Sequence, residues 1–124
     1  MPSTTNARLP HKEPLIFIGE LKEESASEVT FTAHFPFIPT LAMFCEAAAQ
    51  GTSFFPLSPE STIGVVSTFR NIILVSQPLE VETYITITIS HTFNNSYLFA
   101  FKAFMPDTEQ LLATGEIAVF YTSL

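Results

Sequence analysis

Two ionisable side chains in this sequence have the types and surroundings needed for acid–base chemistry. His34 comes directly before Phe35 and Pro36, and Glu46 is followed by three alanines in a strongly apolar segment. Burial raises the pKa of a carboxyl group that has no partner, so that it keeps its proton nearer to neutral pH. A neutral imidazole near a protonated carboxyl group is suited to general base and general acid steps at pH 7.

Each of these residues also has a purely structural interpretation. Glu46 could lie on an exposed strip of a helix or accept a backbone N–H at a subunit contact, and His34 could be an ordinary loop residue. The residues alone leave both interpretations open. His11 lies in a proline-rich turn, His91 ends a predicted strand, and Cys45 has no neighbouring base. We expect structural or surface roles for these three.

The sequence carries no pattern for a metal site or a phosphate-binding loop. Its three histidines lack the spacing of metal ligands, and its four glycines are scattered. We therefore expect no metal and no cofactor.

The elements that must position His34 and Glu46 are strands and one helix. Alternating or densely apolar segments predict strands over residues 15–21, 28–33, 62–75, 81–89, 97–105 and 111–121. Thr40 is a suitable N-cap for a helix over residues 41–54, which is apolar around most of its circumference and is therefore expected to be buried. One buried helix and one antiparallel sheet predict an α+β fold in which the sheet wraps around the helix.

Length, composition and charge limit the classes of protein. The 124 residues, 47% of them hydrophobic, suffice for one domain, and we expect a flexible leader over residues 1–8 and a single domain over residues 9–124. The single cysteine fits a reducing compartment, and no apolar run approaches the roughly 18–20 residues that span a bilayer. We expect a cytoplasmic protein without membrane contact. A net charge of −7 argues against nucleic acid as a partner.

Three segments resemble those of the small hotdog-fold 3-hydroxyacyl-acyl-carrier-protein dehydratases. Residues 9–15 (LPHKEPL) are similar to that family's opening segment, and residues 34–39 (HFPFIP) to its His-Phe-Pro loop. Residues 46–50 (EAAAQ) are similar to its glutamate-bearing helix. The resemblance runs from residue 9 to residue 121. It implies the hotdog fold, an antiparallel sheet wrapped around one long buried helix, and a homodimer or a trimer of such dimers.

The resemblance also implies a reaction, the removal of water from a 3-hydroxyacyl thioester carried by acyl carrier protein or coenzyme A. His34 would take the proton from C2, and Glu46 from the second subunit would protonate the departing hydroxyl group. Backbone N–H groups at the start of the helix, from Leu41 to Met43, would stabilise the enolate oxygen. The further residues expected to bind substrate are Phe37, Ala42, Met43 and Gln50.

Two other functions stay open. In a hotdog thioesterase, Glu46 would activate water or attack the thioester directly. Alternatively, the chain could be a non-catalytic thioester binder or a structural subunit. The segment between His34 and Glu46 lacks the glycine found in the dehydratase family, which favours this last alternative.

Overall fold

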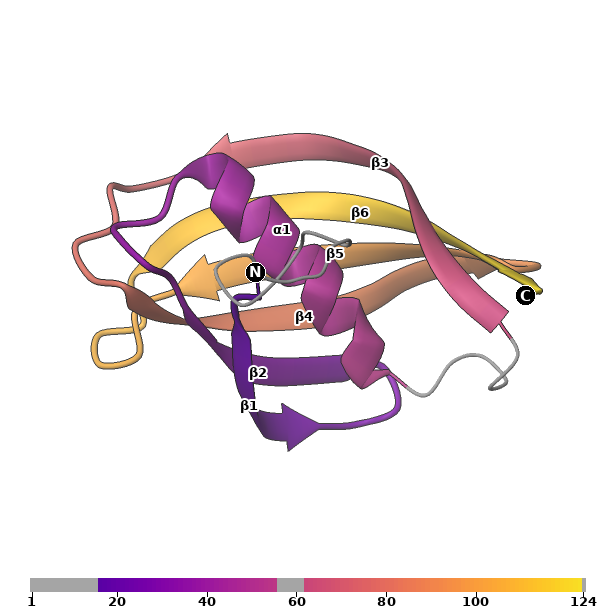
Figure 1. Ribbon diagram of the computed structural model, residues 1–124, viewed down its shortest axis with the longest axis horizontal. Coiled ribbons are helices and arrows are strands. Elements are labelled where there is room, and N and C mark those ends of the chain that lie inside the picture. The colour runs from indigo at the N-terminus through magenta and orange to yellow at the C-terminus, as the bar shows by residue number, and fades with distance from the viewer. Residues whose placement is uncertain (1–15, 56–61, 124) are drawn as a thin grey trace, which may run out of the picture.

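The computed structural model describes residues 16–55 and 62–123, which form six strands, one α-helix and a short 3-10 turn (Figure 1). In chain order these are β1 (Ile18–Glu24), β2 (Glu28–His34), α1 (Leu41–Gly51), the 3-10 turn (Thr52–Phe54), β3 (Thr62–Leu74), β4 (Glu82–Phe93), β5 (Ser96–Phe104) and β6 (Leu111–Ser123). The predicted leader and the segment 9–15 lie outside the described residues, so the proposed division of the chain stays a prediction.

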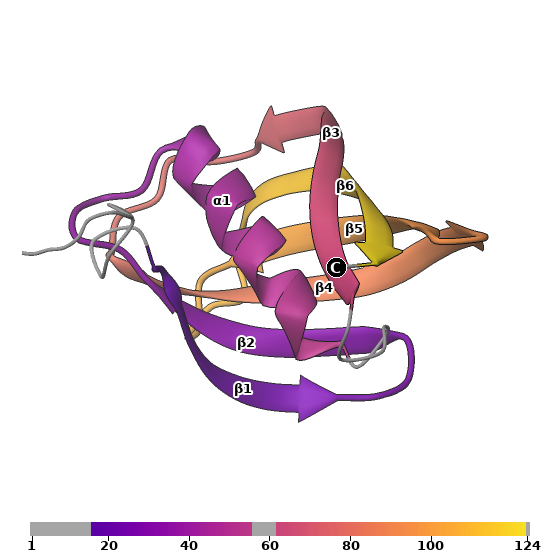
Figure 2. The ribbon, with the colours of Figure 1, turned by 45° about the vertical axis from the view of Figure 1, so that its right-hand side comes forward.

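The six strands form one antiparallel sheet in the order β1-β2-β4-β5-β6-β3. The connection from β2 through α1 to β3 crosses the sheet, so β3 lies at the edge opposite β1. Figures 1 and 2 show the sheet curving around α1, which packs across one face. The predicted α+β arrangement of one helix and an antiparallel sheet is confirmed.

Helix α1 begins at the predicted cap and ends earlier than predicted. The Thr40 side chain accepts a hydrogen bond from the backbone N–H of Met43 at 3.2 Å. The α-helix ends at Gly51 rather than at residue 54, because the last turn tightens into a 3-10 turn. The Thr52 hydroxyl group donates to the carbonyl of Ala49 at 2.7 Å, and hydroxyl groups that bond to nearby carbonyls in this way compete with regular helix.

The hydrophobic core fills the space between α1 and one face of the sheet, which we call the inner face. Alternate residues of the central strands point into it, as the period of two in a strand requires. Its fully buried members include Phe31, Phe44, Ile85, Ile87, Phe99, Phe101 and Ile117. Phe35 and Phe44 meet edge to face, with ring centroids 5.5 Å apart. Phenylalanines thus supply many of the large side chains of the core.

The opposite face of the sheet, which we call the outer face, is not covered by the helix. Its residues are mainly polar or small, and Thr30 and Thr86 share a hydrogen bond of 2.8 Å across β2 and β4. In the part of the chain that the structure describes, no helix is long and apolar enough to cross a membrane.

Candidate active site

Glu46 projects from the exposed side of α1 rather than into the core. The helix packs on the sheet through Phe44, Ala47, Ala48 and Gly51. Since successive residues turn by about 100°, Glu46 lies roughly opposite that face and is exposed. Of the two interpretations that the sequence left open, the structure agrees with the one that places Glu46 on an exposed strip of α1, and the expectation that the helix is buried on nearly all sides is wrong for the single chain.

Gln50 fixes the position of the Glu46 carboxylate. The two residues lie one helical turn apart, and Nε2 of Gln50 donates a hydrogen bond of 3.2 Å to Oε2 of Glu46. The other end of the same amide, Oε1, accepts the backbone N–H of Phe17 at 2.8 Å. Gln50 was expected to bind substrate. That role stays a prediction, and in the structure its amide ties α1 to the residue just before β1.

His34 lies at the end of β2 that leads into α1, with its side chain 64% exposed. Its Nε2 is 3.5 Å from Oε2 of Glu82, the residue opposite it on β4. Its backbone N–H donates to the carbonyl of Phe17 at 2.8 Å. Sequence reasoning missed Glu82 as the neighbour of His34, because that pairing depends on the register between β2 and β4.

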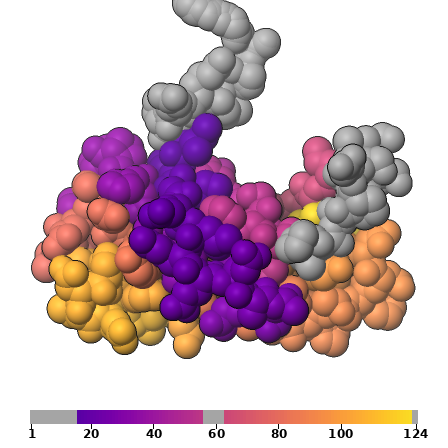
Figure 3. All heavy atoms as spheres, turned by 90° about the horizontal axis from the view of Figure 1, so that it is seen from below, coloured from indigo at the N-terminus to yellow at the C-terminus, as the bar shows by residue number. Residues whose placement is uncertain are grey.

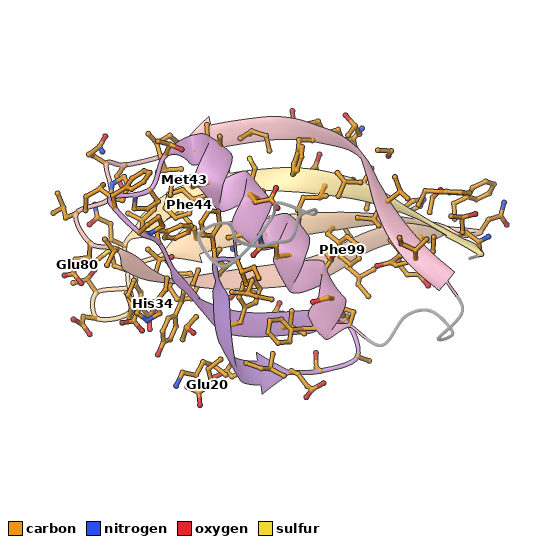
Figure 4. The ribbon with its side chains drawn as sticks, viewed as in Figure 1. Glu20, His34, Met43, Phe44, Glu80 and Phe99 are labelled. Atoms are coloured by element: carbon orange, nitrogen blue, oxygen red, sulfur yellow. The ribbon has the colours of Figure 1, made fainter. Side chains whose placement is uncertain are left out.

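Within one chain, His34 and Glu46 form no hydrogen bond or ion pair with each other among the described residues, but a series of hydrogen bonds connects them. Phe17 accepts from the His34 N–H through its carbonyl and donates to Gln50 through its own N–H. Gln50 in turn donates to Glu46. His34 lies at the end of the molecule where α1 begins (Figure 4), whereas Glu46 lies in the middle of α1.

The first turn of α1 carries the other predicted site residues. Ala42 is exposed and Met43 is half-buried, while Phe37, in the loop before the helix, is 60% exposed. Ala42 precedes Glu46 by four residues and lies on the same face of the helix. The first N–H groups of a helix have no partner within it and bear partial positive charge. This end of α1 is thus suited to stabilising a negatively charged oxygen.

The remaining candidates do not join this group. Cys45 is half-buried on α1, and burial raises the pKa of its thiol. His91 is exposed on β4, as its position near a turn predicted. No group of three potential metal ligands occurs within residues 16–55 and 62–123.

Comparisons with solved structures identify the architecture. No protein-family model and no curated protein matches the sequence. A thioesterase from Haemophilus influenzae is similar in structure, with a TM-score of 0.70 and 10% identity over 85% of this chain and 78% of that one. A hot-dog-like protein from Thermanaerovibrio acidaminovorans has a TM-score of 0.65 and 16% identity over 88% of this chain and 85% of that one. The chain has the hotdog fold.

A third structure shows what one protein of this architecture binds. It is a hypothetical thioesterase from Streptococcus pneumoniae with coenzyme A, with a TM-score of 0.66 and 12% identity over 84% of this chain and 85% of that one. The hotdog fold predicted from the three sequence segments is confirmed. The dehydratase family that suggested it is not confirmed by these likenesses, which at such identities concern the fold alone.

In this hotdog chain, β3 leaves an apolar strip uncovered beside α1. Val66, Phe69 and Leu74 occupy positions on the inner side of β3, yet they are 38%, 39% and 41% exposed. Exposed apolar surface on an edge strand is unusual in a monomer, because it invites pairing with another chain. The strip lies beside the helix that carries Glu46.

Proposed function

We propose that this protein hydrolyses acyl thioesters, with Glu46 as its catalytic carboxylate. The observation that carries the proposal is the exposed Glu46 carboxylate in the middle of α1, held by Gln50 at 3.2 Å. It occurs in a fold shared with structures named as thioesterases from several bacteria. A carboxylate in this position can act as the general base that activates water for attack on a thioester.

The proposed reaction begins with water held by the Glu46 carboxylate. Glu46 takes a proton as the water oxygen attacks the thioester carbonyl carbon, and the carbonyl oxygen becomes an oxyanion. The C–S bond then breaks, the C=O bond re-forms, and the proton passes to the departing thiolate, giving a carboxylic acid and a thiol. Glu46 lies one turn after Ala42 on the same face of α1. The Thr40 side chain already accepts the Met43 N–H, so the N–H groups that would stabilise the oxyanion are those of Leu41 and Ala42.

A pair of chains joined at β3 would complete the site. β3 is a strand of 13 residues at the free edge of the sheet, with Val65 and Ile73 exposed on one side and Val66 and Phe69 on the other. The opposite edge, β1, carries Glu20, Lys22, Glu23 and Glu24 and two register irregularities, which discourage pairing. Pairing through β3 would cover the apolar strip and leave an enclosed path for an acyl chain.

Coenzyme A esters are the first substrates to test. The structure of the hypothetical thioesterase from Streptococcus pneumoniae holds coenzyme A, which supports coenzyme A as the first carrier to test. A net charge of −7 would repel an acidic carrier protein at long range, and it would likewise repel the phosphates of coenzyme A, so the charge does not distinguish the two carriers.

Dehydration of 3-hydroxyacyl thioesters is the second candidate. It is favoured by the exposed imidazole of His34, which lies beside Glu82 and is connected to Glu46 through Phe17 and Gln50. His34 would remove the C2 proton, and a protonated Glu46 would donate a proton as the 3-hydroxyl group leaves as water.

The deciding experiment incubates the purified protein with saturated and 3-hydroxyacyl thioesters of coenzyme A and of acyl carrier protein, followed by mass spectrometry. Thioester hydrolysis predicts free acid and free thiol from both acyl types. Loss of 18 mass units from the 3-hydroxyacyl esters alone, about the mass of water, with the thioester intact would replace hydrolysis by dehydration. Unchanged substrates throughout would refute both activities and favour a non-catalytic binding protein.

A further inference from the structure

Two tyrosines meet on the inner face of the sheet, at the end of the apolar strip on β3. Tyr97 of β5 and Tyr121 of β6 are half-buried and pack edge to face, with ring centroids 5.4 Å apart. Figure 3 shows the start of β3 (pink) and the end of β6 (yellow) at one end of the molecule, opposite the loop that leads into α1 (purple). The tyrosine pair therefore lies at the end of the strip that is remote from the start of α1.

The register of the strands makes the tyrosine pair a continuation of the apolar strip. Val66 of β3 lies opposite Val119 of β6, which in turn lies opposite Tyr97. Two residues before Val66, Gly64 lies opposite Tyr121, and a Cβ atom on Gly64 would be only 2.7 Å from the Tyr121 ring. The ring therefore lies against β3 at the position where the strand has no side chain, and the strip ends on two phenol groups.

Packing does not explain why these two side chains carry hydroxyl groups. The chain has 13 phenylalanines and only three tyrosines, and its core is built with phenylalanine. Phe99, which Figure 4 labels between α1 and β3, stacks on Tyr97 with ring centroids 6.0 Å apart, a contact that a phenylalanine ring would make equally well. Within residues 16–55 and 62–123, neither the Tyr97 nor the Tyr121 hydroxyl group has a hydrogen-bond partner.

Both hydroxyl groups are available as donors at neutral pH. Burial raises the pKa of Tyr121, and the neighbouring Tyr97 raises it further, so this phenol keeps its proton. Covering a hydroxyl group with an apolar group costs free energy, whereas an acceptor placed against it restores a hydrogen bond. The end of the strip therefore favours a ligand atom that accepts hydrogen bonds.

The thioester of the proposed substrate would lie towards the opposite end of the strip. The N–H groups assigned to its oxygen belong to the start of α1, and Figure 1 shows α1 beginning beside the end of β3 and leaving it towards the start of β3. From Leu74 to Gly64 the strand spans at most about 30 Å. Glu46 lies about 8 Å along α1, which leaves on the order of 20 Å between the reacting carbonyl and the tyrosines. A long acyl group fits this span.

We propose that Tyr97 and Tyr121 select thioesters of long acyl groups whose far end carries a neutral oxygen, in a hydroxyl or a carbonyl group. The proposal rests on the proposed function, which supplies the position of the thioester and the acyl path along β3. The two phenol O–H groups would donate to the terminal oxygen, and a plain alkyl end would leave them unpaired. A carboxylate at that end is disfavoured because the chain has a net charge of −7.

The expected selectivity is moderate. Deeply buried sites that bind a hydroxyl group reject the analogue without it very strongly, because their polar groups are then left without partners. The two phenols are only half-buried and keep part of their contact with water. We therefore expect a preference of about tenfold, the usual effect of one or two hydrogen bonds.

The test measures binding rather than turnover, so that it stands apart from the test of hydrolysis. The ligands are 2-oxoalkyl thioethers of coenzyme A, in which a CH₂ group separates the sulfur from the carbonyl and prevents cleavage. Isothermal titration calorimetry gives the dissociation constants of a palmitoyl-length thioether and of its ω-hydroxy form. The wild type should bind the ω-hydroxy form about tenfold more tightly. An octanoyl-length pair, too short to reach the tyrosines, should show no such preference.

Three variants locate the preference. The double variant Tyr97→Phe/Tyr121→Phe keeps both rings and removes both hydroxyl groups, so it should bind the two palmitoyl-length ligands equally. Tyr84→Phe is the matched control, because Tyr84 pairs with Phe104 on the outer face. It should keep the wild-type preference. Tyr121→Phe alone should lose part of the preference, and circular dichroism would show that each variant is folded.

Several results would overturn the inference. They are equal dissociation constants for the two long ligands in the wild type, a preference that survives in the double variant, and failure of both ligands to bind. Hydrolysis of palmitoyl-coenzyme A by a wild type that binds both ligands equally would refute the tyrosine selection and leave the proposed function intact. A tyrosine-dependent preference in a protein that hydrolyses no thioester would refute hydrolysis and support the selection.

Discussion

The amide of Gln50 joins Glu46 to the backbone of Phe17, with a donor–acceptor distance of 3.2 Å to the carboxylate and 2.8 Å to the backbone nitrogen. One side chain thus performs two tasks. It holds the candidate catalytic group, and it ties α1 to the first strand of the sheet.

Substitutions at Gln50 should separate these two tasks. Gln50→Ala removes the acceptor for the Phe17 N–H, and we expect the free energy of unfolding to fall by about 1 kcal/mol. Gln50→Glu keeps an acceptor for that N–H but loses the donor to Glu46. It should therefore lower kcat for thioester hydrolysis as Gln50→Ala does, with a smaller loss of stability. Urea unfolding and steady-state kinetics on the same samples measure both quantities, and equal stability losses in the two variants would refute the division.

Gly51 should not tolerate a side chain, because its backbone lies directly against the ring of Phe31 on β2. A Cβ atom on Gly51 would overlap the ring of Phe31, which is fully buried and has no room to move. We expect Gly51→Ala to destabilise the protein by about 1–3 kcal/mol, although alanine is the better helix former. Gly64→Ala is the matched control, since its Cβ would meet the half-buried ring of Tyr121, which can turn aside. Thermal unfolding of both variants tests this, and a loss for Gly64→Ala as large as that for Gly51→Ala would contradict it.

The thiol of Cys45 should react slowly at neutral pH. Burial raises its pKa, so the fraction present as thiolate, the reactive form, is smaller than in an unfolded chain. We expect alkylation by iodoacetamide at pH 7.5 to be slower in the folded protein than in the same protein in urea. The folded rate should rise as the pH increases. Mass spectrometry over time measures both rates, and equal rates in the folded and unfolded protein would contradict the prediction.

Glu116 should contribute to the loss of stability in acid. Hydrogen bonds from Arg70 at 2.8 Å and Asn71 at 2.9 Å lower the pKa of its carboxyl group. Between the lowered pKa and the ordinary value of about 4.3, the unfolded chain binds more protons than the folded one. The contribution is therefore fully present above the ordinary value and is lost as the pH falls through the folded-state pKa.

Glu116→Gln removes this titration. The urea midpoint of that variant should fall less than that of wild type between pH 7 and about pH 3. Asp107→Asn, in the exposed β5–β6 turn, provides a comparison that leaves the Arg70–Glu116 contact intact. A wild-type pH dependence in Glu116→Gln would show that the contact does not stabilise the folded state.

The fold could be predicted from the sequence because the patterns that indicate its strands and its helix are local. Alternation along β4 and the cap at Thr40 each depend on a few consecutive residues, and both predictions are confirmed. The orientation of α1 could not be predicted from the sequence, because a helix that is apolar around most of its circumference does not show which side faces the sheet. The structure resolves this by placing Glu46 on the exposed side.

The contacts that define the candidate site could not be predicted from the sequence. Gln50 forms a hydrogen bond with Phe17, which lies 33 positions earlier in the sequence, and His34 meets Glu82 only because β2 and β4 pair in one particular register. The roles of His34 and Glu46 therefore stay predictions, and the residues that connect them, Phe17 and Gln50, could not be identified from the sequence.

The most direct test of the central claim is kcat/KM for acyl-coenzyme A hydrolysis by Glu46→Gln, which preserves the shape of the side chain and removes its basicity. We predict a loss of about 10²–10⁴-fold, with the melting temperature nearly unchanged because Glu46 is exposed. Glu24 is another exposed carboxylate, on β1, and the Glu24→Gln variant should hydrolyse the substrate as the wild type does. Wild-type kcat/KM in a folded Glu46→Gln variant would contradict the assignment of Glu46 as the catalytic residue.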